Sequence, residues 1–157
     1  MNEGTIKGLL VVSAVCLLVV IPNCRKETEQ DKIRKVITSV QQAAEEKDIK
    51  KIITCLSRTY HDPQGYDHDT IKGLLLGYFF RHQKVHVLVP EIVISVDGAG
   101  AKAEFQAVLT GGQTGSAADI MPEALGMYTF DVSLRKEDNE WKVVSARWNR
   151  VGEGPIQ

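Results

Sequence analysis

The stretch that decides the fold is YTFDVSLR at residues 128–135, with the polar turn EDNE at 137–140 and the segment WKVVSARW at 141–148 directly after it. In the first of these segments, apolar side chains occupy every even position from 128 to 134 and polar side chains lie between them. A period of two is typical of a strand with one buried face, and two such runs joined by a short polar turn predict an antiparallel hairpin. The chain therefore ends in a sheet with one apolar face.

The same pattern extends upstream of the hairpin. Residues 101–110, AKAEFQAVLT, alternate in a similar way, and DGAG at 97–100 is a strong turn signal before them. Residues 86–96 are rich in Val, Ile and Leu, and Pro90 among them indicates an edge strand or a bulge, because proline has no N–H to donate. The glycine-rich segment 111–118 joins strand to strand. Together these patterns predict about four antiparallel strands.

Helical spacing dominates the part of the chain before residue 85. Apolar residues recur at intervals of three and four from Ile33 to Ala44, which predicts an amphipathic helix over about 29–46. Asp48 is the expected N-cap of a second helix, and Asp69 is the expected N-cap of a third that runs to His82. Helices followed by strands predict an α+β domain whose three helices pack on one face of the sheet.

This order of elements, and above all the closing hairpin at 128–148, resembles the nuclear transport factor 2-like superfamily. The loop Tyr60-His61-Asp62 between the second and third helices fits the same resemblance, which covers residues 29–151. It implies a strongly bent antiparallel sheet, wrapped round the helices to form a cone with a pocket. The superfamily includes ketosteroid isomerases, dehydratases, polyketide cyclases and members without chemistry, so the resemblance implies a fold rather than an activity.

The N-terminus has the pattern of a signal peptide, over residues 1–23. Lys7 precedes an uncharged run from Leu9 to Ile21, which as a helix reaches only ~20 Å, less than the ~30 Å hydrocarbon core of a bilayer. The tetrapeptide Ile21-Pro22-Asn23-Cys24 resembles the bacterial lipobox, in which the cysteine is diacylated and becomes the new N-terminus. The resemblance implies a lipid on Cys24. An ordinary cleavage and an uncleaved leader are the alternatives.

Four segments follow from these patterns: the signal peptide at 1–23, a lipidated cysteine with a short tether at 24–28, the domain at 29–151 and a flexible tail at 152–157. We expect the protein in the bacterial cell envelope, anchored on the periplasmic or outer side of a membrane. Within the domain Cys55 is the only cysteine, so no internal disulfide can form. The 19 basic and 20 acidic residues give a net charge of −1, which argues against a nucleic-acid partner.

Titratable groups are scarce where the cone would need them. If Phe105 and Phe130 point inward, the residues that share their face are apolar, and Glu104 and Asp131 fall on the outer face. Acid–base chemistry would then have to use Tyr60, His61 and Asp62 at the mouth of the cone, or His82. We expect Asp62 instead to accept backbone hydrogen bonds at its turn, as Asx residues do.

No metal or cofactor is predicted. His61, Asp62, Asp67, His68 and Asp69 lie close together in the sequence, but their spacing matches no recognised set of ligands. The glycine-rich loop lacks the spacing of a phosphate-binding loop. The candidate lining of a ligand pocket is aromatic: Phe105, Phe130, Tyr78 and Trp141.

The sequence therefore favours a lipid-anchored, noncatalytic domain that binds a small apolar ligand or an envelope protein. A cofactor-free lyase, isomerase or hydrolase of the polyketide-cyclase type is the alternative that the resemblance implies. The resemblance also implies a weak homodimer, paired through the polar outer face of the sheet, which carries Glu104, Gln106, Asp131, Ser133 and Arg147.

Overall fold

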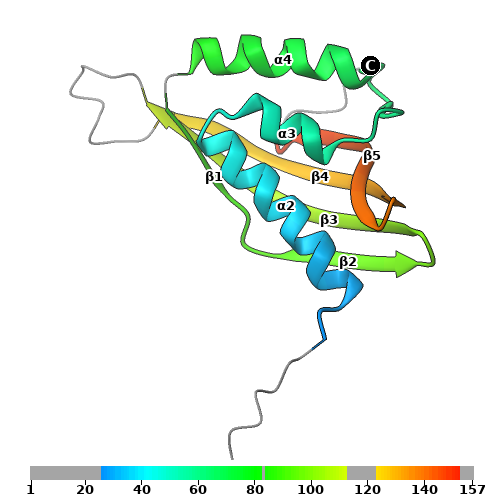
Figure 1. Cartoon of the computed structure of the whole chain (residues 1–157). Coiled ribbons are helices and arrows are strands. Elements are labelled where there is room, and N and C mark those ends of the chain that lie inside the picture. Colours follow the sequence, from blue (N-terminus) through cyan, green and yellow to red (C-terminus); the bar gives the residue numbers. More distant parts are fainter. Residues whose placement is uncertain (1–25, 83, 113–122, 153–157) are drawn as a thin grey trace, which may run out of the picture.

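A computed structural model of the chain describes residues 26–82, 84–112 and 123–152. Three helices pack on one face of a curved antiparallel sheet of five strands (Figure 1). The helices are α2 (Glu29–Glu45), α3 (Ile49–Cys55) and α4 (His68–Arg81), and the strands are β1 (Lys84–Leu88), β2 (Ile92–Asp97), β3 (Gly100–Gly112), β4 (Glu123–Glu137) and β5 (Glu140–Arg150). The predicted α+β class and the three helices are confirmed. The leader, Cys24 and most of the C-terminal tail lie outside the described residues.

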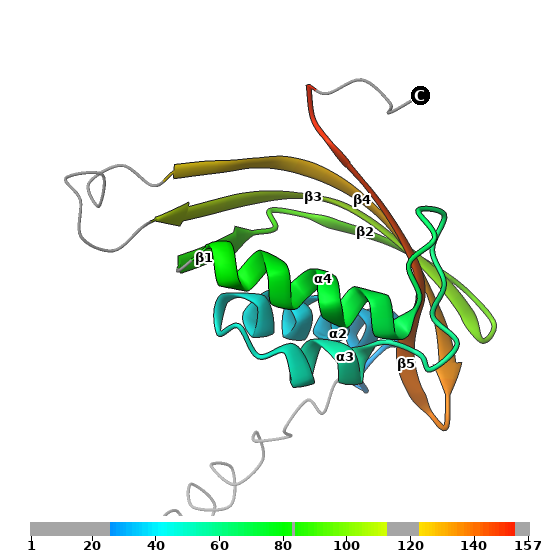
Figure 2. The same cartoon turned by 90° about the horizontal axis from the view of Figure 1, so that it is seen from above.

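The sheet has one strand more than the sequence predicts. β3, β4 and β5 form a meander, while β1 and β2 both pair with β3, β2 along its first half and β1 along its second. Pro90 lies between β1 and β2 and divides the single strand expected over residues 86–96 into two. Bulges between Leu109 and Thr110 and between Ser133 and Leu134 bend the long strands, so the sheet curves round the helices (Figure 2).

Local signals start each helix, and one of them differs from the prediction. Thr28 and Asp31 form a capping box at the start of α2, and the Asp48 carboxylate accepts a hydrogen bond from the Lys51 N–H as predicted. The N-cap of α4 is Asp67, whose carboxylate accepts from the Thr70 N–H, and not Asp69. Asp69 lies inside the first turn, where its negative charge still favours the helix dipole.

The turn between β4 and β5 sets the register of the closing hairpin. Asp138 and Asn139 have φ angles of 48° and 67°, the left-handed conformation that a two-residue type I′ turn requires. Glu137 therefore pairs with Glu140, and the predicted alternation follows along both strands up to the bulge.

The inner face of the sheet has two halves. Near the β2–β3 turn it is lined by the buried Ala101 and Ala103, whose small side chains let Ile33 and Ile37 of α2 pack closely. Further along, Phe105 and Phe130 also face inward, as expected, but both are only half-buried. A second apolar cluster, around Phe79 and Ile52, joins α4 to α3.

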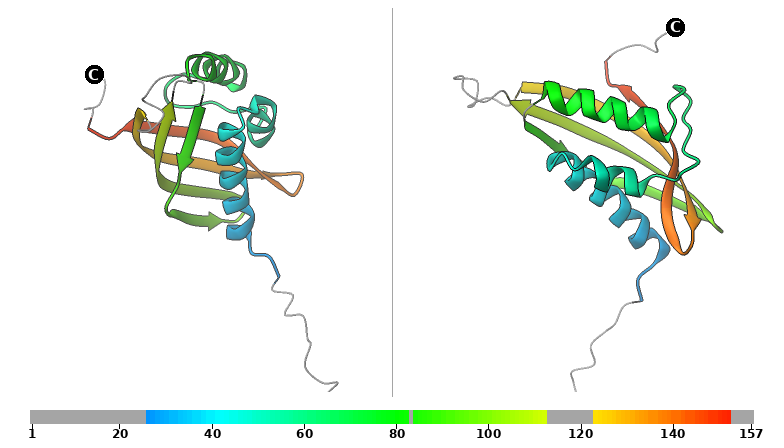
Figure 3. Two further views of the ribbon diagram at one scale, coloured as in Figure 1. Left: turned by 90° about the vertical axis from the view of Figure 1, so that its left-hand side faces the viewer. Right: turned by 45° about the horizontal axis from the view of Figure 1, so that its top comes forward.

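Both free edges of the sheet are covered (Figure 3). Side chains of α2 bind the edge backbone of both strands. On β1, Gln41 donates to the Val87 carbonyl at 2.7 Å and Glu45 accepts from the Val87 N–H at 2.8 Å; on β2, Gln30 and Arg34 donate to carbonyls at 3.4 Å. On β5 the bulge directs the Val143 and Val144 carbonyls toward the loop after α3, where the Ser57 and His61 N–H groups donate to them at 2.8 and 3.1 Å. No edge in these stretches is left to recruit another strand.

Glu29 connects the start of α2 to the closing hairpin. Its carboxylate accepts hydrogen bonds from Trp141 Nε1 at 2.7 Å, Lys32 Nζ at 2.8 Å and Lys136 Nζ at 3.0 Å. The bond from Lys32, followed by those from Lys136 and Trp141, lowers the pKa of Glu29 from 4.5 to about 2. The first residue of α2 is thereby attached to β4 and β5.

Replacing Glu29 with Gln should lower the free energy of unfolding at neutral pH, because an amide takes the place of the anion beside two ammonium groups. The folded pKa is depressed, so the contribution is present above pH 4.5 and is lost as the pH falls from 4.5 toward 2. The difference between the urea unfolding curves of wild type and Glu29→Gln should close over that range. Glu91→Gln, at an exposed position, is the control and should follow wild type at every pH.

Candidate functional site

The loop between α3 and α4 contains the candidate acid–base residues, and its centre is buried. Asp62 is 2% exposed and Tyr60 is 3% exposed. The Tyr60 hydroxyl donates to one Asp62 oxygen at 2.9 Å, and the N–H groups of Gln64 and Tyr66 donate to the other at 3.0 and 2.9 Å. Burial, followed by the hydrogen bond to Asp62, raises the pKa of Tyr60. Asp62 thus stabilises the turn with both oxygens, as the sequence predicts.

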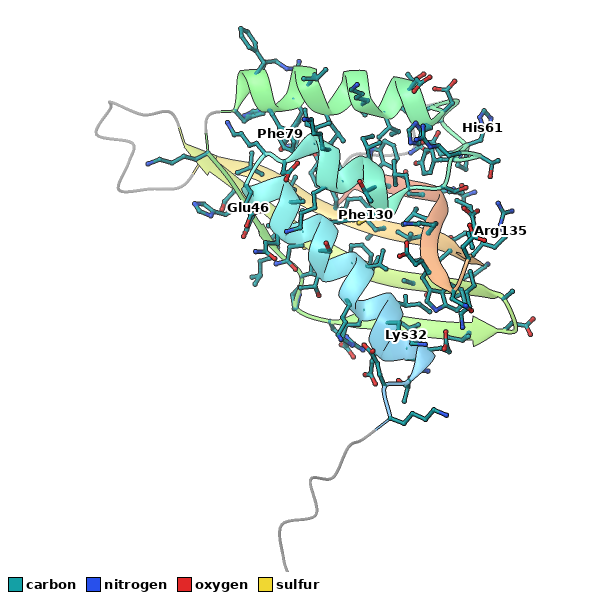
Figure 4. The ribbon with its side chains drawn as sticks, in the orientation of Figure 1. Lys32, Glu46, His61, Phe79, Phe130 and Arg135 are labelled. Atoms are coloured by element: carbon teal, nitrogen blue, oxygen red, sulfur yellow. The ribbon has the colours of Figure 1, made fainter. Side chains whose placement is uncertain are left out.

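His61 does not join this pair. Its side chain is exposed, and Figure 4 shows it at the periphery of the molecule, away from Phe130 in the sheet. Its backbone N–H donates to Val144, and it forms an isolated bridge with Asp67. The structure therefore separates the imidazole from the Asp62 carboxylate, although the two residues are adjacent in the sequence.

The other candidate ligands are also dispersed. Asp67 caps α4, His68 Nδ1 lies 3.4 Å from the exposed Asp69 carboxylate, and His82 ends α4 with its ring 4.7 Å from the ring of Tyr78. Across the described part of the chain, no group of three His, Cys, Asp or Glu side chains is arranged to hold a metal ion.

Three of the four aromatic candidates gather at one half of the inner face: Phe105 and Phe130 lie on the sheet under α4, and Tyr78 lies on α4 itself. Phe105 and Phe130 stack with ring centroids 5.1 Å apart, and Tyr128 lies 6.5 Å from Phe130. Tyr78 on α4 approaches this group from the helical side: burial first, and then the neighbouring Tyr128, raises the pKa of its hydroxyl. The Tyr78 hydroxyl is buried and has no hydrogen-bond partner in the described structure. An unpaired buried hydroxyl is costly, which marks this position as unusual.

Trp141, the fourth candidate, lies apart from the others. It is 3% exposed in the core, and its indole N–H donates to Glu29. It pairs with Lys136 on β4, six residues beyond Phe130, which corresponds to roughly 20 Å along the strand. Its place in the structure is at the closing hairpin.

A shallow hollow of about 600 Å³ lies on the opposite, outer face of the sheet. Its polar lining comes from three adjacent strands: Glu104 and Gln106 of β3, Thr129 and Asp131 of β4, and Arg147 and Asn149 of β5. Pro90, Glu91 and Val93 border it. The sequence places these polar side chains on one face, but the register that aligns them depends on the bulges.

No family model matches the chain, and no curated protein matches its sequence. Several solved structures share its fold. An NTF2-like protein with a cystatin-like fold from Novosphingobium aromaticivorans aligns with a TM-score of 0.66 at 11% identity, covering 98% of this chain and 95% of that one. A candidate dehydratase of the NTF2-like family from Streptomyces avermitilis aligns with a TM-score of 0.64 at 11% identity, covering 78% and 96%.

Bd1075 of Bdellovibrio bacteriovorus aligns with a TM-score of 0.64 at 14% identity, and here the match covers 80% of this chain but 43% of Bd1075. At these identities the likeness shows the fold alone. The chain has the NTF2-like, cystatin-like fold that its sequence resembles.

Replacing Asp62 with Ala should lower the free energy of unfolding by about 2 kcal/mol, because it leaves the buried Tyr60 hydroxyl and two N–H groups without their acceptor. Urea denaturation measures this change. His61→Ala, one residue away and exposed, is the matched control and should stay within about 0.5 kcal/mol of wild type. Equal effects of the two substitutions would contradict the structural role of Asp62.

Proposed function

We propose that this protein is an exported, lipid-anchored envelope protein whose domain binds a small apolar ligand between α4 and the inner face of the sheet, without catalysis. The observation that carries the binding site is the half-buried aromatic group under α4. Its rings, from Phe105, Phe130 and Tyr128, offer apolar surface that the helix does not fully cover. The buried, unpartnered Tyr78 hydroxyl at its border supplies one hydrogen bond for a polar group on the ligand.

The contacts of the acid–base candidates favour ligand binding over catalysis. Both oxygens of Asp62 accept hydrogen bonds from its own loop, and His61 is exposed at the periphery. A general base needs to lie within about 2.6–3.2 Å of the proton it takes, and a carboxylate whose two oxygens are both occupied by its own loop is poorly placed to take one. The alternative function, a cofactor-free lyase, isomerase or hydrolase, would have to use His82, which contacts Tyr78 at the end of α4.

The Phe130→Leu variant should bind the fluorescent probe anilinonaphthalene sulfonate about fivefold more weakly than wild type, because the change removes a ring but keeps an apolar side chain, a loss of ~1 kcal/mol. A fluorescence titration measures the dissociation constant. Phe80→Leu is the matched control: Phe80 is 90% exposed on the outer side of α4, so this variant should bind the probe like wild type. Equal weakening by both changes would place the probe elsewhere.

The anchoring proposal rests on the leader and the lipobox-like tetrapeptide ending at Cys24. Among the described helices, none is long and apolar enough to cross a membrane. Helix α2 has its N-cap at Thr28, so a tether from Cys24 would have few residues and would hold the domain close to the bilayer surface.

Cys24→Ser should abolish labelling of the protein by a radioactive or clickable fatty acid and should change its processing. Cys55→Ser is the control, because Cys55 is half-buried on α3 and its thiol pKa is raised by burial; labelling should persist in this variant. Normal labelling of Cys24→Ser would overturn the lipid anchor.

A further inference from the structure

Arg150 places a cation at the border of the aromatic group under α4. It pairs with Tyr128 across β4 and β5, and Trp148, two residues earlier on β5, pairs with Phe130. Side chains two residues apart on a strand share a face of the sheet, so Arg150 lies on the same inner face as these rings. The row of rings on β5 thus ends in a guanidinium.

Gly126 makes room for this guanidinium on the neighbouring strand. Its φ angle is 131°, and a Cβ at this position would lie 2.7 Å from Arg150 Nε and 3.3 Å from the Tyr128 ring. Any other residue would therefore have to move one of these two side chains. Because the glycine has no side chain, the Arg150 guanidinium can lie against β4 beside the ring of Tyr128.

Polar groups of α4 lie at the same end of the inner face. The end of α4 lies over the end of the sheet where β4 begins (Figure 1, Figure 2). Here the Tyr78 hydroxyl is buried without a partner in the described structure. Burial raises the pKa of this hydroxyl, the interaction with Tyr128 raises it further, and the charge on Arg81 lowers it. Electrostatic effects weaken with distance, so Tyr128 and Arg81 both lie near the hydroxyl.

The inner face under α4 therefore has an apolar part and a polar border. The stacked rings of Phe105 and Phe130 offer apolar contact. The border offers the N–H groups of Arg150 and the O–H group of Tyr78. A guanidinium has five N–H donors in a planar fork, which matches the two oxygens of a carboxylate. A neutral apolar molecule would use the rings alone, whereas a molecule with an apolar chain and a carboxylate would use both parts.

We propose that the ligand under α4 is an amphiphilic carboxylate, with its apolar chain on the rings of Phe105 and Phe130, its carboxylate on Arg150 and the Tyr78 hydroxyl as a second donor. This inference rests on the proposed function, since it names the chemical class of the ligand for that site. Arg150 selects the anion, and the rings supply the apolar contact. The carboxylate is bound and is not transformed.

Competition with the neutral fluorescent probe N-phenyl-1-naphthylamine tests the ligand class in the full chain. Octanoate should displace the probe from wild type with a dissociation constant about tenfold below that of 1-octanol, because charge-assisted hydrogen bonds are the stronger ones. Arg150→Gln should weaken octanoate binding about tenfold and leave the binding of octanol and of the probe unchanged. Arg150→Lys keeps the charge but loses the planar fork, so it should retain part of the preference for octanoate.

Arg147→Gln is the matched control. Arg147 lies three residues before Arg150 on the same strand, and it lines the hollow on the outer face of the sheet. This variant should therefore keep the full preference for octanoate. Equal effects of Arg147→Gln and Arg150→Gln would overturn the role of Arg150.

Two results with wild type separate this inference from the proposed function. A chain that binds the neutral probe but shows equal affinity for octanoate and octanol would overturn the carboxylate ligand and leave the apolar binding site in place. A chain that binds neither the probe nor octanol nor octanoate would overturn the proposed function and this inference together.

Discussion

The two free edges of the sheet are the constraint on which the rest of this structure depends. An open sheet leaves a row of N–H and C=O groups on each outer strand, and these groups must find partners or they will recruit another chain. α2 covers the edge at β1 with Gln41 and Glu45, and the loop after α3 covers the β5 edge at Val143 and Val144. The positions of α2 and of this loop are therefore set by backbone hydrogen bonds as well as by apolar packing.

These two attachments decide how the inner face is divided. α2 lies along one edge and packs Ile33 against Ala101 and Ala103, where the small side chains allow close contact. The loop on the opposite edge leads directly into α4, which consequently lies over the aromatic half. α4 covers this half less completely, since Phe105, Phe130 and Tyr128 beneath it are only half-buried. The candidate ligand site follows from this unequal division.

The local sequence predicted the structure correctly where residues alternate with a period of two or where a tight turn requires particular residues. The alternation at 101–109 and 128–134 predicted the two faces of the sheet, and Asp138 and Asn139 fix the hairpin register. The predicted number of strands was one too low, because Pro90 divides residues 86–96 into two strands. This effect of Pro90 depends on which strands pair with β3. Asp67 and Asp69 both precede the same helical run, so the choice of cap depends on where the preceding turn ends. Glu29 binds Lys136 and Trp141 more than 100 residues away, and no local pattern reveals that contact.

The need to cover the sheet edges also limits acid–base chemistry in the loop between α3 and α4. To act as a base, Asp62 would have to release the Tyr60 hydroxyl or the N–H groups that shape its turn. His61, directly before Asp62 in this loop, donates its N–H to the Val144 carbonyl on β5, so a change in the turn would act on a residue that covers the sheet edge. Catalysis at this position would thus work against the fold. A ligand under α4 would contact rings that no edge requires, and Tyr78 would gain the hydrogen bond that it lacks. Binding on the inner face, as proposed above, would leave the hydrogen bonds of the Asp62 loop in place.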